Sequence, residues 1–121
     1  MTTNWVPRPT NLLTEVRAAD AAAQAARAVP GVVRLQPGVL GLLRHFAAQA
    51  WTQATGKALP DIAGVDADLT ADGLRIDLRI VVSVFYQAAE VGDAVHRAVA
   101  SVVDATQIRV HIVEVDLEPV R

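Results

Sequence analysis

Two runs of alternating apolar and polar residues constrain the fold of this chain more than any other feature. Residues 65–70 and residues 74–84 both alternate, and Asp72-Gly73 lies between them. A period of two places the apolar side chains on one face of a β-strand. Because Asp-Gly is typical of a type I′ turn, the segment predicts an antiparallel hairpin with one face in a hydrophobic core.

A two-residue turn at Asp72-Gly73 also predicts the register of this hairpin. Counted outward from the turn, the predicted pairs are Ala71 with Leu74, Leu69 with Ile76, Ala67 with Leu78 and Val65 with Ile80. Each apolar residue of the first strand then faces an apolar residue of the second. On the polar face, the same register sets Asp68 opposite Asp77, with Arg75 and Arg79 on the diagonals.

The last apolar segment, residues 108–118, changes phase along its length. Ile108, Val110 and Ile112 share one phase, whereas Val113, Val115 and Leu117 share the other. The switch predicts either a β-bulge or a strand that is buried on both faces midway.

Three stretches have the spacing of amphipathic helices. The first is alanine-rich, is capped by Thr10 or Asn11, and ends at Pro30-Gly31 before a short strand at residues 32–35. Its predicted apolar stripe consists of Leu12, Val16, Ala19, Ala23 and Ala26. The second helix is predicted at Val39–Thr55. The third lies between Gln87 and Gln107, with a buried stripe of Val91, Ala94, Val95, Ala98, Val99 and Val102.

This element order predicts an α+β fold in a single domain. Helix, strand, helix, two hairpin strands, helix and strand follow one another between residues 10 and 121, after a flexible N-terminal arm at residues 1–9. We expect a four-stranded mixed sheet with the helices mainly on one face. The strand order stays open between a ferredoxin-like arrangement and an antiparallel meander that carries the 39–55 helix as an insertion.

Composition excludes several classes of site. The chain has 121 residues, a net charge of −2 and no cysteine, so it cannot form disulfides or zinc-thiolate sites and has no basic footprint for nucleic acid. It contains no apolar segment of about 20 residues, which a membrane span requires, and no N-terminal pattern of a secretory signal. Nucleophile elbows, phosphate-binding loops and dinucleotide fingerprints are absent.

The individual polar residues also predict no catalytic, cofactor or metal site. His45, His96 and His111 lack a second ligand at metal-binding spacing. The carboxylates Asp61, Asp66, Asp68 and Asp72 are spaced as the solvent face of a strand that runs into a turn, and not as a calcium loop. We therefore expect no cofactor.

The middle helix is the candidate interaction surface. Its apolar stripe includes Leu42, Leu43, Phe46 and Trp51. The stripe therefore contains two of the five aromatic residues of the chain. Such a stripe either covers the sheet or is presented to a partner, in which case Trp51 is a natural anchor.

Two stretches of the chain, residues 14–36 and 64–118, resemble the alkaline shock protein 23/Gls24 family of bacterial envelope-stress proteins. The resemblance lies in an alanine-rich helix that ends in Pro-Gly-Val, and in a long apolar strand, a helix and a valine-rich strand that follow one another. Where the family usually has Tyr-Gly after the long strand, this chain has Phe85-Tyr86-Gln87, as in a divergent member. The resemblance implies a non-enzymatic, cytoplasmic protein, with some members self-assembling and others held near the membrane by an anchor protein.

We therefore expect an interaction or scaffold protein of the envelope stress response. Its partners would be a second copy of itself or a membrane-anchored protein, bound through a hydrophobic surface that includes the middle helix or an edge strand. The alternative is a small-ligand-binding or enzymatic α+β domain with a pocket between sheet and helices, into which His111, Arg109 or Tyr86 would point.

Overall fold

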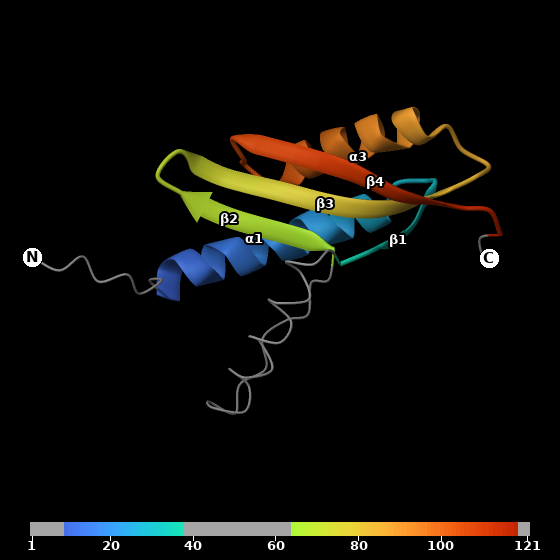
Figure 1. The fold of residues 1–121 in the computed structure, drawn as a ribbon. Coiled ribbons are helices and arrows are strands. Elements are labelled where there is room, and N and C mark those ends of the chain that lie inside the picture. Colours follow the sequence, from blue (N-terminus) through green and yellow to red (C-terminus); the bar gives the residue numbers. More distant parts are fainter. Residues whose placement is uncertain (1–8, 38–63, 119–121) are drawn as a thin grey trace, which may run out of the picture.

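The computed structural model describes residues 9–37 and 64–118 (Figure 1). In chain order they form α1 (Pro9–Arg27), β1 (Val32–Leu35), β2 (Val65–Thr70), β3 (Gly73–Ser83), α3 (Ala88–Val102) and β4 (Gln107–Asp116). The predicted arm lies outside these residues except for Pro9, which is the first residue of α1. The predicted helix at 39–55 also lies outside them, together with its stripe of Leu42, Leu43, Phe46 and Trp51.

The described residues form an α+β fold around one central strand. Strand β3 pairs antiparallel with β1 and with β2, and pairs parallel with β4. The sheet is therefore mixed, as the sequence predicts. Its order differs from both a ferredoxin-like sheet and a meander, because β4 returns through α3 to lie directly beside β3 and parallel to it.

Strands β1 and β2 lie end to end along the same edge of β3. β1 pairs with residues 80–82 of β3 and β2 with residues 73–78, while β4 follows the opposite edge. The change from one strand to the other falls at Arg79, which accepts a hydrogen bond from the Gln36 amide and donates one to the Gly64 carbonyl, both 2.9 Å long. The chain thus leaves the sheet and re-enters it at the same point.

The β2–β3 hairpin has a different turn from the predicted one. Ala71 and Asp72 form the turn, and Thr70 pairs with Gly73, so the predicted register is wrong by two residues. The φ angle of +118° at Gly73, with no positive φ at Ala71 or Asp72, excludes a type I′ turn. The Thr70 hydroxyl accepts a hydrogen bond from the Asp72 amide and caps this turn.

This shift keeps apolar residues opposite apolar residues but changes the pairs on the polar face. Val65 pairs with Leu78, Ala67 with Ile76 and Leu69 with Leu74. Asp68 lies opposite Arg75 and not opposite Asp77, which pairs instead with Asp66. A displacement of two residues conserves the alternation, so the hydrophobic pattern alone does not distinguish the two registers.

The phase change in the last strand corresponds to a β-bulge. Ile80 pairs with Ile112, but the next residue, Val81, pairs with Glu114, so Val113 is the extra residue in β4. Of the two alternatives that the sequence left open, the bulge is confirmed. Arg109 and His111 before the bulge lie on the same face of the sheet as Glu114 and Asp116 after it, because their partners are alternate residues of β3.

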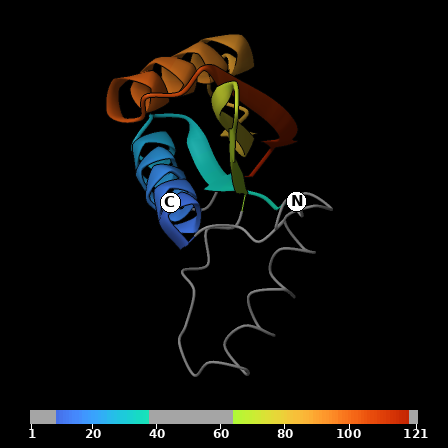
Figure 2. The same cartoon turned by 90° about the vertical axis from the view of Figure 1, so that its left-hand side faces the viewer.

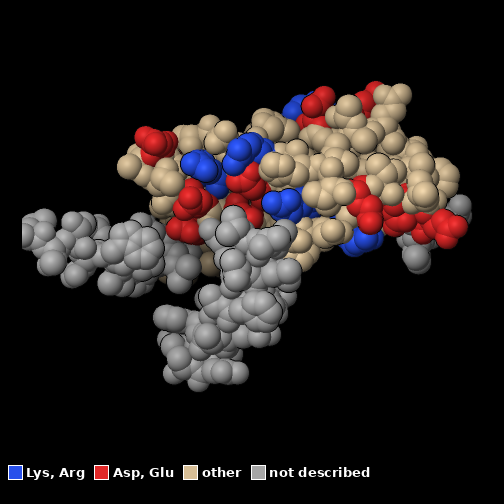
Figure 3. All heavy atoms as spheres, viewed as in Figure 1, with Lys and Arg blue, Asp and Glu red and all other residues tan. Residues whose placement is uncertain are grey.

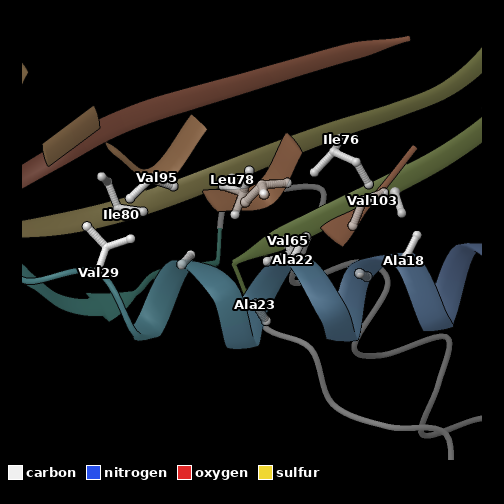
Figure 4. Packing of buried hydrophobic residues seen from close by; sticks show 14 of the residues in the cluster. Ala18, Ala22, Ala23, Val29, Val65, Ile76, Leu78, Ile80, Val95 and Val103 are labelled. Atoms are coloured by element: carbon white, nitrogen blue, oxygen red, sulfur yellow. The ribbon is translucent and has the colours of Figure 1, made fainter. Parts of the chain in front are cut away.

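Both helices cover one face of the sheet, as expected (Figure 2). The apolar side chains of β3, except that of Val81, point into this layer and meet α1 and α3 there (Figure 4). The helix α1 contributes mainly alanines, because Ala18, Ala19, Ala22, Ala23 and Ala26 are all buried. Small side chains let the helix approach the sheet closely. We call the covered face the helix face and the other one the open face.

The helix α3 buries a narrower stripe than predicted. Val91, Val95 and Val99 are buried, but Val102 is 54% exposed. The helix ends at Val102, and the extended backbone of Val103 places that next side chain in the core instead. Because the helix ends at Val102, the last buried position is Val103 and not Val102 as predicted.

The Pro30-Gly31 junction joins α1 to the sheet by close packing. Gly31 has a φ of +97°, and its carbonyl accepts a hydrogen bond of 2.9 Å from the Ser83 amide. A Cβ atom at this position would lie 2.7 Å from Cγ2 of Val91 and 2.9 Å from Cγ of Tyr86. The conformation and the packing therefore both favour glycine.

Candidate functional site

The outer edge of β4 is the more open of the two edges of the sheet. Within the described residues β4 pairs only with β3, so its other side presents unpaired backbone groups along a ten-residue strand (Figure 1). The opposite edge is made of the short strands β1 and β2, and β2 carries two aspartates. Short strands and charged residues protect an edge from pairing with another chain.

Apolar side chains are exposed in the second half of β4 and directly after its end at Asp116. Ile112, Val113, Val115 and Leu117 are 40%, 38%, 44% and 71% exposed, and we call these four residues the β4 strip. Isolated apolar residues are normal on a protein surface, but a run of them along an unpaired strand is typical of an interaction site. The β4 strip and the β4 backbone are therefore the candidate functional site.

The open face of the sheet is charged, and positive and negative side chains alternate over β2, β3 and β4 (Figure 3). At its centre, Asp77 of β3 accepts a hydrogen bond of 2.9 Å from Nε of Arg109, and its Oδ1 lies 3.1 Å from Nε2 of His111. Both partners come from β4. This cluster therefore ties β4 to the central strand by side chains as well as by the backbone.

A second charged group joins both edges of the sheet across β3. Arg34 of β1 and Glu114 of β4 are each paired with Val81, from opposite sides, and their side chains meet at 2.7 Å. Arg34 also lies 3.7 Å from Asp116. The ion pair lies across Val81. This residue belongs to the open face and not to the core cluster, but it has no exposed surface.

The environment of Asp77 stabilises its ionised form. Partial burial alone would raise the pKa of Asp77, but the hydrogen bonds from His111 and Arg109 and their positive charges lower it below its ordinary value. The carboxylate is thus held in its charged form by two β4 side chains.

Replacement of this carboxylate (Asp77→Asn) is expected to lower the free energy of unfolding by about 1 kcal/mol at neutral pH. Because the folded-state pKa is lowered, the ionised group stabilises the fold above about pH 4 and loses this contribution as the pH falls through the folded-state pKa. Thermal unfolding followed by circular dichroism should show the variant and the wild type converging in acid. Asp93→Asn, on the exposed side of α3, is the matched control, and a deficit that does not depend on pH would contradict the role of Asp77.

The residues that the sequence analysis singled out fall in three places. Leu42, Leu43, Phe46 and Trp51 lie outside the described residues. Arg109 and His111 lie on the open face with Asp77, and Tyr86 packs against Gly31 and is half exposed. Among residues 13–37 and 64–118, Ser83 is the one buried polar residue, and no buried side-chain nitrogen or oxygen lacks a partner. In the described part of the chain, no group of three or more potential ligands is placed to hold a metal ion.

Sequence reasoning missed the cluster of Asp77, Arg109 and His111. Asp77 is more than thirty positions away from Arg109 and His111 in the sequence and meets them only through the parallel β3–β4 register. The available signal was the alternation of Arg109 and His111 in the last strand, which matches that of Arg75, Asp77 and Arg79 in the hairpin strand.

Comparisons with protein-family models, with curated proteins and with solved structures gave no match. Neither α1 nor α3, the two helices that the structure describes, has the length and apolar content of a membrane span.

Proposed function

We propose that this protein acts as a non-enzymatic interaction or scaffold module, and that it binds another protein chain along the outer edge of β4. The observation that carries the proposal is the β4 strip: apolar side chains are exposed along a strand whose backbone, among the described residues, is unpaired on that side. A chain that adds a strand there would satisfy the backbone groups and remove the β4 strip from water.

The resemblance to the alkaline shock protein 23/Gls24 family supports the same class of function. It favours a cytoplasmic protein of the envelope stress response, with either a second copy or a membrane-anchored protein as partner. The segments that carry the resemblance include β3, α3 and β4, which form the proposed binding edge and the elements that support it.

The polar residues of the described part of the chain also favour binding over catalysis. The side chains of Arg109 and His111 are 51% and 41% exposed. They contact Asp77 on the open face of the sheet and do not converge in a cleft. Ion pairs with this exposure orient side chains and set the charge pattern that a partner meets.

Site-specific photo-crosslinking in living cells tests the proposal. A benzophenone amino acid at position 113 places the reactive group in the β4 strip, and one at position 100 places it on the exposed side of α3 as a control. We expect ultraviolet light to give a protein adduct from position 113 and none from position 100. The absence of an adduct from position 113, or equal adducts from both positions, would overturn the proposed function.

A further inference from the structure

We propose that two copies of this chain pair their β4 strands antiparallel, across a two-fold axis between Ile112 and Val113, and so join their sheets into one. This inference rests on the proposed function and names the occupant of the β4 edge. A two-fold axis gives a closed, isologous contact in which each pair of residues occurs twice.

The bulge determines which partner fits this edge. In an antiparallel pair, residues directly opposite each other have side chains on the same face. In β4, Arg109 and His111 point to the open face before the bulge, and Glu114 and Asp116 do so after it. A regular partner strand can match the faces of the β4 side chains before the bulge, but its side chains then point to the wrong faces after the bulge. A strand that carries the same bulge changes face at the same place, so its side chains match those of β4 in both halves.

The two-fold axis at the bulge pairs the faces correctly along the strand. The resulting pairs are Arg109 with Asp116, Val110 with Val115, His111 with Glu114 and Ile112 with Val113, each between one copy and the other. Val110 and Val115 both belong to the helix face, because their partners in β3 are Leu78 and Val82. The apolar residues of one copy would thus cover those of the other at the centre of the contact.

The charges of β4 are complementary in this register. Basic residues occupy the first half of the strand and acidic residues the second half, so that antiparallel pairing sets Arg109 opposite Asp116 and His111 opposite Glu114. A parallel arrangement of two copies in register would set each charge against its own kind. Charge complementarity therefore favours the antiparallel dimer.

The existing ion pairs are compatible with the contact. Arg109 already donates to Asp77 through Nε, which leaves the other donors of its guanidinium for Asp116 of the second copy. Asp116 lies 3.7 Å from Arg34 in its own chain. In the dimer these groups would form a chain of alternating charges, Asp77, Arg109, Asp116 and Arg34, that crosses from one sheet to the other.

Disulfide trapping tests the pairing. Because the chain has no native cysteine, every disulfide must form between the introduced cysteines. In the double variant Val110→Cys/Val115→Cys, the two positions lie opposite Leu78 and Val82 of β3. They are therefore about 13 Å apart along the strand, which is too far for a bond within the chain. Each cysteine would instead lie opposite its complement in the second copy. Mild oxidation of the purified variant is expected to give a covalent dimer on a non-reducing gel.

Three controls define the register. Val110→Cys alone and Val115→Cys alone are expected to stay monomeric on the gel, because like positions lie far apart across the axis. Ile108→Cys/Val115→Cys places its cysteines diagonally, beyond disulfide reach, and is expected to give no dimer. Circular dichroism of each variant verifies folding. A dimer in the diagonal variant but not in Val110→Cys/Val115→Cys would overturn the register.

Sedimentation equilibrium of the wild-type chain gives a second measurement, which holds even if a cysteine variant does not fold. We expect a dimer that is lost in the folded variant Val113→Lys. A wild-type chain that stays monomeric and gives no disulfide dimer overturns the pairing. If position 113 still yields an adduct with a different protein in cells, the proposed function stands and only the second copy is excluded as the partner.

Discussion

Truncation of the leucine at the centre of β3, Leu78→Ala, is expected to lower the free energy of unfolding by about 3–4 kcal/mol, through lost burial and the cavity that remains. Leu78 has no exposed surface, and it pairs with Val65 of β2 on one side and Val110 of β4 on the other. Neighbours held in strands on both sides have little freedom to close the cavity.

Thermal and urea unfolding measured by circular dichroism provide the readout for Leu78→Ala. The expected fall in melting temperature is roughly 10–15 °C for a domain of this size. Val102→Ala removes two side-chain carbons, compared with three in Leu78→Ala, but at a position that is 54% exposed. It is expected to change stability by less than about 0.5 kcal/mol. Equal effects of the two substitutions would contradict the position of Leu78 in the core.

The substitution Gly31→Ala adds one methyl group at the junction of α1 and the sheet. It is expected to lower the free energy of unfolding by about 3 kcal/mol. The φ of +97° at Gly31 accounts for about 1–2 kcal/mol, because a Cβ atom disfavours this region. The clash with Val91 and Tyr86 accounts for the rest. Val91 is buried in α3, so relief of the clash requires the helix itself to move.

The same substitution elsewhere in the chain is the matched control for Gly31. Gly92 lies inside α3, and among the described residues a Cβ there would meet only Cδ1 of Ile112, at 3.4 Å. Gly92→Ala is therefore expected to raise the free energy of unfolding by about 0.5–1 kcal/mol through helix propensity. Urea unfolding of both variants measures the contrast, and a loss of stability in both, or in neither, would contradict this account of Gly31.

The faces of the sheet could be predicted from the sequence, but the register of the hairpin could not. Alternation in residues 65–84 identifies the side chains that are buried, and it does so for any displacement by two residues. What selects the observed register is local: Gly73 adopts the positive φ, and the Thr70 hydroxyl caps the turn. The phase change after Ile112 was readable because it interrupts an otherwise regular pattern.

The charged groups on the open face, beside the candidate site, depend on contacts between distant segments. Asp77 meets Arg109 and His111 only because β4 lies parallel to β3, and Arg34 meets Glu114 only because both strands flank Val81. Neither the parallel pairing nor the end-to-end arrangement of β1 and β2 has a local signal in the sequence. The exposure of the β4 strip likewise follows from the strand's place at the edge.

The hydrogen bonds at Arg79 hold Gln36 and Gly64 at one point of the sheet. Both ends of the stretch between them are fixed to one residue of β3, so β1 and β2 form one continuous edge of the sheet. The entropic cost of such an excursion rises only slowly with its length. We therefore expect a change in the length of this interval to affect the fold little, as long as Gln36 and Gly64 keep their hydrogen bonds to Arg79.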